Sequence, residues 1–137
     1  MVLASTQVRR IPSKNVSSPH RISLRTHWKV EQRIPSDPSG EAEFLAFRVF
    51  HCPTGISRLQ HVCFCFEPFE VRQAFFLNGI EIPWNIIDGL ATVPITSMME
   101  PKNRVELRWR GTPQETPYLP EHFKAWLEIS NDSQIDL

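Results

Sequence analysis

Apolar side chains occupy every second position in several short runs of this sequence. Over 105–109 valine, leucine and tryptophan alternate with charged residues, and the same spacing recurs over 61–67 and 123–129. Successive side chains of a β-strand point to opposite faces, so this spacing is typical of strands with one buried face. The runs therefore predict an all-β protein.

Two further segments extend the pattern in different ways. Over 20–30 the apolar residues alternate with basic ones, which predicts one half-buried strand. Over 43–50 apolar residues fall on both parities, which predicts a strand covered on both sides, or a central strand beneath the N-terminal segment.

Turn-forming residues separate the runs at intervals of about ten residues. Asn78-Gly79 stands between two apolar segments, and both residues tolerate the positive φ that a tight hairpin needs. Ser97 and Glu100 have the spacing of a capping box, which predicts one short helical turn near 97–100. About seven strands with such punctuation predict an antiparallel β-sandwich, and nine phenylalanines and four tryptophans supply rings for its interior.

The charges are unevenly placed although the formal net charge is zero. Residues 1–29 carry six lysines or arginines and no acid, which leaves nine bases against fifteen acids in the rest. We expect a basic, flexible arm over 1–19, a single sandwich domain over 20–130 and a polar tail over 131–137. The arm either contacts an anionic partner or folds back onto the acidic body, and its few dispersed bases favour the second.

The cysteines and the apolar runs bear on the compartment. Cys63 and Cys65 do not have CxxC spacing, and as alternate residues of a strand they share one face as small apolar side chains. Free thiols suit a reducing compartment, residues 1–20 contain no apolar signal segment, and no apolar run approaches the ~20 residues of a membrane helix. We therefore expect a cytoplasmic protein with no membrane partner.

The titratable residues form none of the familiar catalytic or metal-binding patterns. The five histidines show no HxH, HxxxH or HExxH spacing, so no metal is expected. His51 and Cys52 are neighbours whose side chains point to opposite faces of a strand, so they do not form a base and a nucleophile. No glycine-rich phosphate loop is present. We expect no catalytic residues, no metal and no cofactor.

Several motifs follow one another in a recognisable order. They are a Leu-Asn-Gly hairpin at 77–79, an Ile-Thr pair at 95–96, and an asparagine followed by alternating aliphatic residues over 103–109. This order resembles the sugar-binding, galactose-binding-like jelly-roll domain at the front of family-two glycoside hydrolases. Segment 47–55, which ends in Pro-Thr-Gly, looks like small uncharacterised bacterial proteins in which a Leu-Asn-Gly hairpin follows.

The resemblance implies a jelly-roll sandwich and says little about activity, because each motif also has a folding role. The Asn-Gly pair makes a turn, Thr96 caps the helical turn, and Asn103 bonds the backbone at the start of its strand. We therefore do not expect the barrel domain of those hydrolases, nor the catalytic carboxylates that they place there.

The loop over 81–89 carries the first candidate ligand site. Trp84, Asn85 and Asp88 place an aromatic face beside planar hydrogen-bonding groups, a combination that suits sugars. The alternative is that Trp84 closes the end of the core as a lid, without any ligand.

A second candidate surface comprises Tyr118, His122 and Trp126. Trp126 shares its parity with charged residues, so its ring is expected to be exposed and to mark a partner surface or the edge of a homodimer. Alternatively, the arm over 1–19 covers it.

These features favour a non-catalytic binding or adaptor module for a carbohydrate or a protein. One alternative is a nucleic-acid accessory protein that uses the basic arm. The least favoured alternative is an enzyme of an unrecognised type.

Overall fold

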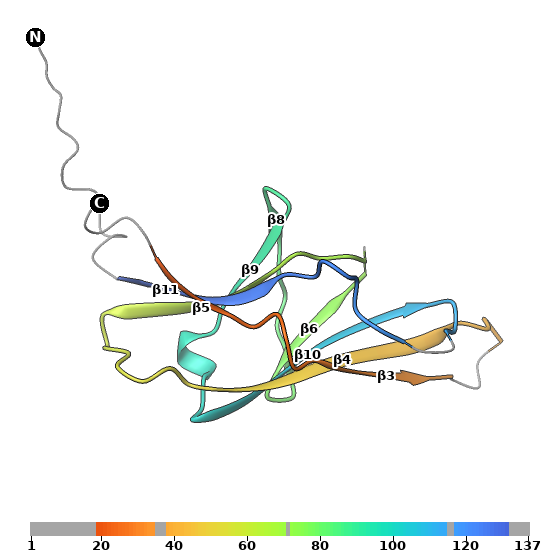
Figure 1. The fold of residues 1–137 in the computed structure, drawn as a ribbon, viewed down its shortest axis with the longest axis horizontal. Coiled ribbons are helices and arrows are strands. Elements are labelled where there is room, and N and C mark those ends of the chain that lie inside the picture. Colours follow the sequence, from red (N-terminus) through yellow and green to blue (C-terminus); the bar gives the residue numbers. More distant parts are fainter. Residues whose placement is uncertain (1–18, 35–37, 71, 115–116, 132–137) are drawn as a thin grey trace, which may run out of the picture.

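The computed structural model describes residues 19–34, 38–70, 72–114 and 117–131. They form two antiparallel sheets of five strands each (Figure 1), the first in the order β3–β4–β10–β6–β7 and the second in the order β2–β11–β5–β9–β8. The strands are β2 His20–Ser23, β3 Lys29–Arg33, β4 Ala42–His51, β5 Gln60–Phe66, β6 Ala74–Leu77, β7 Ile80–Glu81, β8 Ile86–Ile87, β9 Leu90–Pro94, β10 Lys102–Gly111 and β11 Ala125–Asn131. The predicted all-β sandwich is confirmed.

The predicted arm and tail lie almost wholly outside the described residues. Of 1–19 only Pro19 is described, and of 131–137 only Asn131, which is the last residue of β11. Within the described ranges, no helix is long and apolar enough to cross a membrane.

Alternation along the strands separates an interior face from an outer face. In β10, Val105 and Leu107 have no exposed surface, whereas Arg104 and Arg110 are exposed. β10 lies in the middle of the first sheet, between β4 and β6. The period of two read from the sequence therefore gives the correct interior face for this strand.

Aromatic rings join the two sheets. Phe64 of β5 is fully buried, and its ring centroid lies 5.2 Å from that of Phe75 in β6 of the other sheet. Phe66 stacks on Phe75 with centroids 5.8 Å apart and an angle of 8° between the rings. Burial of each such side chain contributes roughly 1.5–3 kcal/mol, so these rings are a main source of stability.

The chain passes from one sheet to the other at each side of the sandwich. On one side the crossing joins the edge strands β2 and β3, and on the other side it joins β7 and β8. Trp28 covers the first crossing: it packs edge-on against Phe123, with centroids 5.5 Å apart, and donates its indole N–H to the carbonyl of Leu24 at 2.7 Å. Trp84 has the corresponding position in the second crossing.

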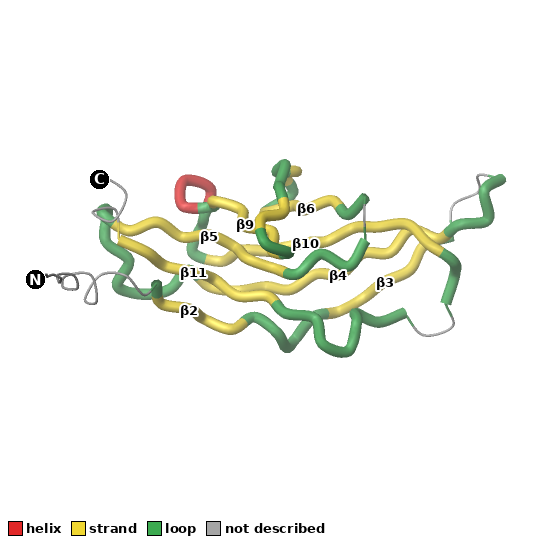
Figure 2. The backbone as a smooth tube through the Cα atoms, turned by 90° about the horizontal axis from the view of Figure 1, so that it is seen from above, coloured by secondary structure: helices red, strands yellow, loops and turns green. Residues whose placement is uncertain are grey.

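The prediction of one strand over 20–30 is wrong. The chain leaves β2 after Ser23, turns with His27 at a φ of +68°, and continues as β3 in the other sheet; the two strands lie end to end along one side of the molecule in Figure 2. Ile22 and Trp28 both pack against the core. Both sheets face the same interior, so apolar and polar residues keep alternating where the chain crosses from one sheet to the other. The sequence pattern therefore gives no sign of the crossing.

β4 buries apolar residues on both faces, as predicted, but the outer cover comes from a neighbouring strand. Phe44 and Phe50 are buried against the interior, and Leu45 is buried on the outer face. Phe47 is half-buried beneath the guanidinium of Arg104, whose carbon lies 3.9 Å from the ring centroid. A long basic side chain on β10 therefore supplies the expected cover.

Two hairpins depend on residues with positive φ. Asn78 and Gly79, with φ of +52° and +84°, connect β6 to β7 as predicted. Asp88 and Gly89, with φ of +55° and +78°, connect β8 to β9. This second hairpin projects from the two layers (Figure 1).

The predicted helical turn is a 3-10 turn over Thr96–Met98, which begins one residue earlier than expected. The expected caps are wrong, because no side chain bonds the backbone at its N-terminus. The hydroxyl of Thr96 instead accepts the backbone N–H of Val62 at 2.8 Å. It therefore fastens the turn to β5.

Candidate functional site

A cavity of about 540 Å³ opens beside the crossing from β7 to β8. Its lining includes Arg72 and Gln73 from the segment before β6, Glu81 from β7, and Trp84 and Asn85 from the crossing itself. We call it the Trp84 cavity. Its volume lies within the range of small-molecule sites, roughly 300–1,000 Å³.

Trp84 serves both the core and this cavity. Its ring packs edge-on against Phe66, with centroids 5.4 Å apart, and its indole N–H donates to the carbonyl of Gln73 at 3.0 Å. The side chain is half-buried. It is therefore a lid on the core that also lines the cavity, and it offers a ligand apolar ring surface, because its nitrogen is already bonded.

Three planar polar side chains in the lining have no partner among the described residues. Arg72, Glu81 and Asn85 are exposed, and none of their side chains makes a hydrogen bond or an ion pair with another described residue. One positive and one negative charge balance each other. The cavity therefore offers donors and acceptors to a ligand without a strong preference for its charge.

Gln73 brings a buried amide to the same cavity. Only 5% of this residue is exposed, and its side-chain oxygen accepts the backbone N–H of Phe69 at 3.2 Å. In the part of the chain that the structure describes, its Nε2 is the one buried side-chain nitrogen or oxygen without a hydrogen-bond partner. An unsatisfied buried donor costs roughly 1–3 kcal/mol. Because the nitrogen has almost no exposed surface, a ligand would reach it only if the side chain turned toward the cavity.

The structure brings together two of the three residues predicted for this site. Trp84 and Asn85 line the cavity, whereas Asp88 lies at the tip of the β8–β9 hairpin and is not part of the lining. The sequence analysis missed Arg72 and Gln73, which come from another strand connection. Asp88 has a folding role, because Asp-Gly is a favoured pair for a tight turn.

The second predicted surface is only partly assembled. Trp126 lines a cavity of about 320 Å³, and His122 lines an adjoining one of about 190 Å³ that shares Arg25 and Lys124 with it. Tyr118 is 68% exposed and lines neither. Trp126 is half-buried rather than exposed, because the guanidinium of Arg21 lies over its ring, 4.8 Å from the centroid.

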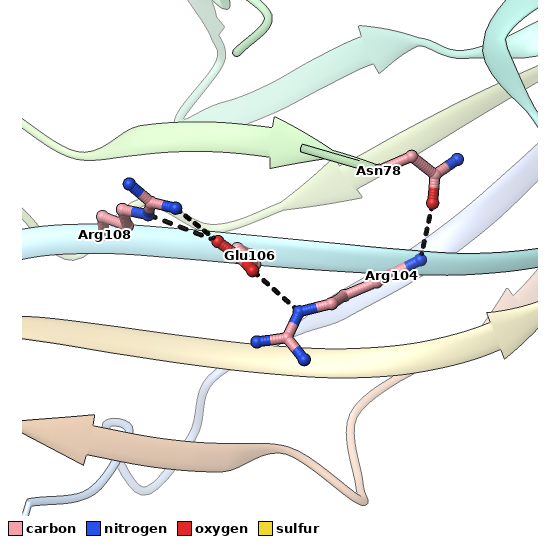
Figure 3. Close-up of polar contacts among 4 residues, drawn as sticks. All are labelled: Asn78, Arg104, Glu106 and Arg108. Carbon is pink, nitrogen blue, oxygen red and sulfur yellow. Dashed lines mark hydrogen bonds and ion pairs between the residues drawn. The ribbon is translucent and has the colours of Figure 1, made fainter. Parts of the chain in front are cut away.

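A ladder of charges runs along the outer face of β10 (Figure 3). The carboxylate of Glu106 accepts hydrogen bonds from Arg104 at 2.7 Å and from Arg108 at 2.9 Å. Arg104 covers Phe47, and Arg108 covers Phe76 at 4.1 Å from the ring centroid. The ladder therefore has a structural explanation: its one carboxylate holds both of the arginines that cover the outer rings.

Acid is expected to weaken the fold through Glu106. Burial by itself raises the pKa of this carboxyl, but the hydrogen bonds and charges of Arg108 and Arg104 outweigh it, so the pKa is lowered. A lowered pKa in the folded state gives stability that is present above the unfolded pKa of about 4.3 and is lost as the pH falls through the folded pKa. Urea unfolding between pH 6 and pH 3 should show a smaller acid-induced loss for Glu106→Gln than for the wild type.

Glu121→Gln is the matched control for this measurement, because Glu121 is exposed and makes no ion pair with a described residue. It should keep the wild-type pH dependence. Equal pH dependence in the wild type and in Glu106→Gln would show that the ladder does not contribute.

The thiols of β5 are poor nucleophiles. Burial first, and then the charge of Glu128, raise the pKa of Cys63, and the same two causes raise that of Cys65 to about 11. Because the thiolate is the reactive form, both residues stay protonated and unreactive at neutral pH. Cys65 is almost fully buried, in agreement with its predicted role as a small apolar side chain.

Neither a metal-binding group among the described residues nor a similar known protein indicates a function for this site. No group of three or more His, Cys, Asp or Glu residues within the described ranges is placed to hold a metal ion. No protein-family model matches the sequence, and neither the curated proteins nor the solved structures include a significant match. The resemblance to galactose-binding-like domains therefore stays a prediction.

Proposed function

We propose that the chain is a non-catalytic binding module and that the Trp84 cavity binds a neutral sugar. The observation that carries this proposal is the lining itself. Apolar ring surface from Trp84 lies in the same cavity as three planar side chains, those of Arg72, Glu81 and Asn85, which have no partner among the described residues. Sites for small polar ligands combine apolar surface with a few placed polar groups in this way.

A sugar fits this lining better than other ligand classes. Its C–H surface packs on an aromatic ring, and its hydroxyls both donate and accept, which matches a guanidinium, a carboxylate and an amide in one cavity. The opposite charges of Arg72 and Glu81 favour a neutral ligand over an ion.

The number of carboxyl groups in the lining favours binding of a sugar without its cleavage. Glycoside hydrolysis uses two carboxyl groups that flank the scissile bond. Among the described residues of the lining there is one, Glu81. The cavity therefore has the polar groups for recognition, and one carboxyl fewer than hydrolysis requires.

A glycan array followed by calorimetry with the sugars that bind tests the proposal. Glu81→Gln and Asn85→Ala should each weaken binding about tenfold, since one hydrogen bond to a ligand contributes about 1.5 kcal/mol. The folded state should be unaffected, because both side chains are exposed.

Glu121→Gln again serves as the control, since it removes an exposed carboxylate that is not part of the lining. An array on which no glycan binds would overturn the sugar proposal, and so would site variants that bind as well as the control. Protein binding would then be the favoured function, because Ile86 and Ile87 are 55% and 69% exposed on the projecting hairpin.

A further inference from the structure

A basic groove lies along the outer face of the β2–β11 edge of the second sheet. Arg21, Ser23, Arg25, Lys124 and Trp126 line its cavity of about 320 Å³. β2 pairs with β11 in the register that places Ser23 opposite Trp126. Residues about a hundred positions apart in the sequence therefore form one continuous surface, which we call the basic groove.

Two of its three bases are not neutralised. Arg21 lies 3.2 Å from the carboxylate of Glu128. The side chains of Arg25 and Lys124 make no ion pair or hydrogen bond with any described residue. Both bases continue into the adjoining cavity of about 190 Å³, in which Glu121 is the one acidic residue of the lining. The positive charge of the groove is therefore available to an anion.

The outer face of the first sheet provides a contrast. Its arginines have carboxylate partners within 4 Å: Arg104 and Arg108 pair with Glu106, Arg33 with Glu43, and Arg110 with Glu41. Glu106 pairs with both Arg104 and Arg108, and each arginine of this set therefore has a carboxylate beside it. Around Trp126, by contrast, Arg25 and Lys124 have no carboxylate within 4 Å among the described residues.

The ring in the groove is suited to a flat partner. Trp126 donates its indole N–H toward the carboxylate of Glu128 at 3.4 Å, and the Arg21 guanidinium lies over its ring. Guanidinium planes and indole rings both stack on nucleic-acid bases, and exposed bases of single strands are held in this way. A basic track with a stacking ring is the usual combination for single-stranded nucleic acid.

The sequence that precedes the groove carries the same charge. β2 is the first described strand, and residues 1–19 before it contain Arg9, Arg10 and Lys14 and no acid. The sequence on the N-terminal side of β2 is therefore basic, as the groove is.

We propose that the basic groove binds single-stranded nucleic acid, with Arg25 and Lys124 on the phosphates and Trp126 against a base. This site is separate from the Trp84 cavity, and it places the contacts in the folded domain rather than in the N-terminal segment alone. Each phosphate contact on a single strand contributes about −0.7 to the slope of log K against log salt concentration.

The full chain should bind a fluorescent oligothymidine of about twelve nucleotides in an anisotropy titration between 50 and 200 mM NaCl. Arg25→Gln/Lys124→Gln should weaken binding on the order of tenfold at 50 mM and reduce the magnitude of the salt slope by about 1.4. The matched control is Arg58→Gln/Lys102→Gln, which removes the same charge from exposed positions outside the groove. It should change binding less than twofold.

Trp126→Leu is the second variant, and loss of one stacked base should weaken binding roughly 5- to 150-fold. Circular dichroism checks that it folds, and the charge variants do not depend on that outcome. Equal losses in the groove and control variants would overturn the proposal, as would the absence of binding at 50 mM. Binding of heparin without binding of oligothymidine would also overturn it, because the ligand would then be a sulfated polysaccharide.

Discussion

Replacing Phe64 with alanine is expected to lower the free energy of unfolding by about 3–5 kcal/mol. Phe64 is fully buried at the centre of the sandwich. Its ring centroid lies between 5.2 and 6.5 Å from those of four other rings, Phe75, Phe66, Phe50 and Trp28. Truncation leaves a cavity that residues of both sheets cannot close without moving.

Such a loss is a large share of the total, because domains unfold with about 5–15 kcal/mol. Urea unfolding followed by tryptophan fluorescence measures it. Phe47→Ala is the matched control, since this ring is half-buried on the outer face under a flexible arginine, and it should cost about 1 kcal/mol. Equal losses in the two variants would mean that the interior is not organised around Phe64.

The segment over 20–30 shows what apolar alternation determines and what it leaves open. It correctly places Leu24 and Trp28 toward the interior. It does not distinguish a strand that continues in one sheet from a chain that crosses to the facing sheet, since both keep the same residues inside. The backbone at His27, which adopts a positive φ, marks the crossing, but histidine is not among the residues that dominate turns, so the sequence gives no clear turn signal there.

The candidate sites have the same limit at longer range. Trp84 and Asn85 are adjacent in the sequence, so a local pattern finds them. Arg72 reaches the same cavity from another connection, and Arg25 reaches Lys124 only because β2 pairs with β11. Pairing between strands so far apart depends on the whole topology, which periodicity does not encode.

Asp88 is the one residue predicted for the sugar site that does not line the Trp84 cavity. Its carboxylate suited a sugar site, but an Asp-Gly pair between two short apolar segments is also a hairpin signal, as with Asn78-Gly79. The positive φ values at both pairs show that the two have the same role. The preference of tight turns for Asn-Gly and Asp-Gly therefore predicts a hairpin at 88–89 as well as at 78–79.

The second large effect is expected from Asn103→Ala, with a loss of about 2–4 kcal/mol. Asn103 is 1% exposed. Its oxygen accepts the backbone N–H of Glu100 at 2.8 Å and the side-chain amide of Asn78 at 3.0 Å, and its nitrogen donates to the carbonyl of Glu100 at 2.7 Å. Alanine leaves all three groups without these partners in a region with little access to water. Urea unfolding measures the loss.

Asn131→Ala is the control for this variant, because Asn131 is exposed and bonds Gln60 at 3.3 Å. It should cost less than about 0.5 kcal/mol. A loss below about 1 kcal/mol for Asn103→Ala would show that water replaces the lost partners.

A double-mutant cycle separates the link to Asn78 from the rest of this network. Asn78→Gly is the suitable partner, because glycine keeps the positive φ of the hairpin while it removes the side chain that bonds Asn103. If the bond couples the β6–β7 hairpin to the start of β10, the double variant should lose less stability than the two single losses added together, by about 0.5–3 kcal/mol. Additive losses would mean that the side-chain bond between the two asparagines does not couple the hairpin to β10, so that the link rests on the hydrogen bonds between Asn78 and Arg104 and on the pairing of β6 with β10.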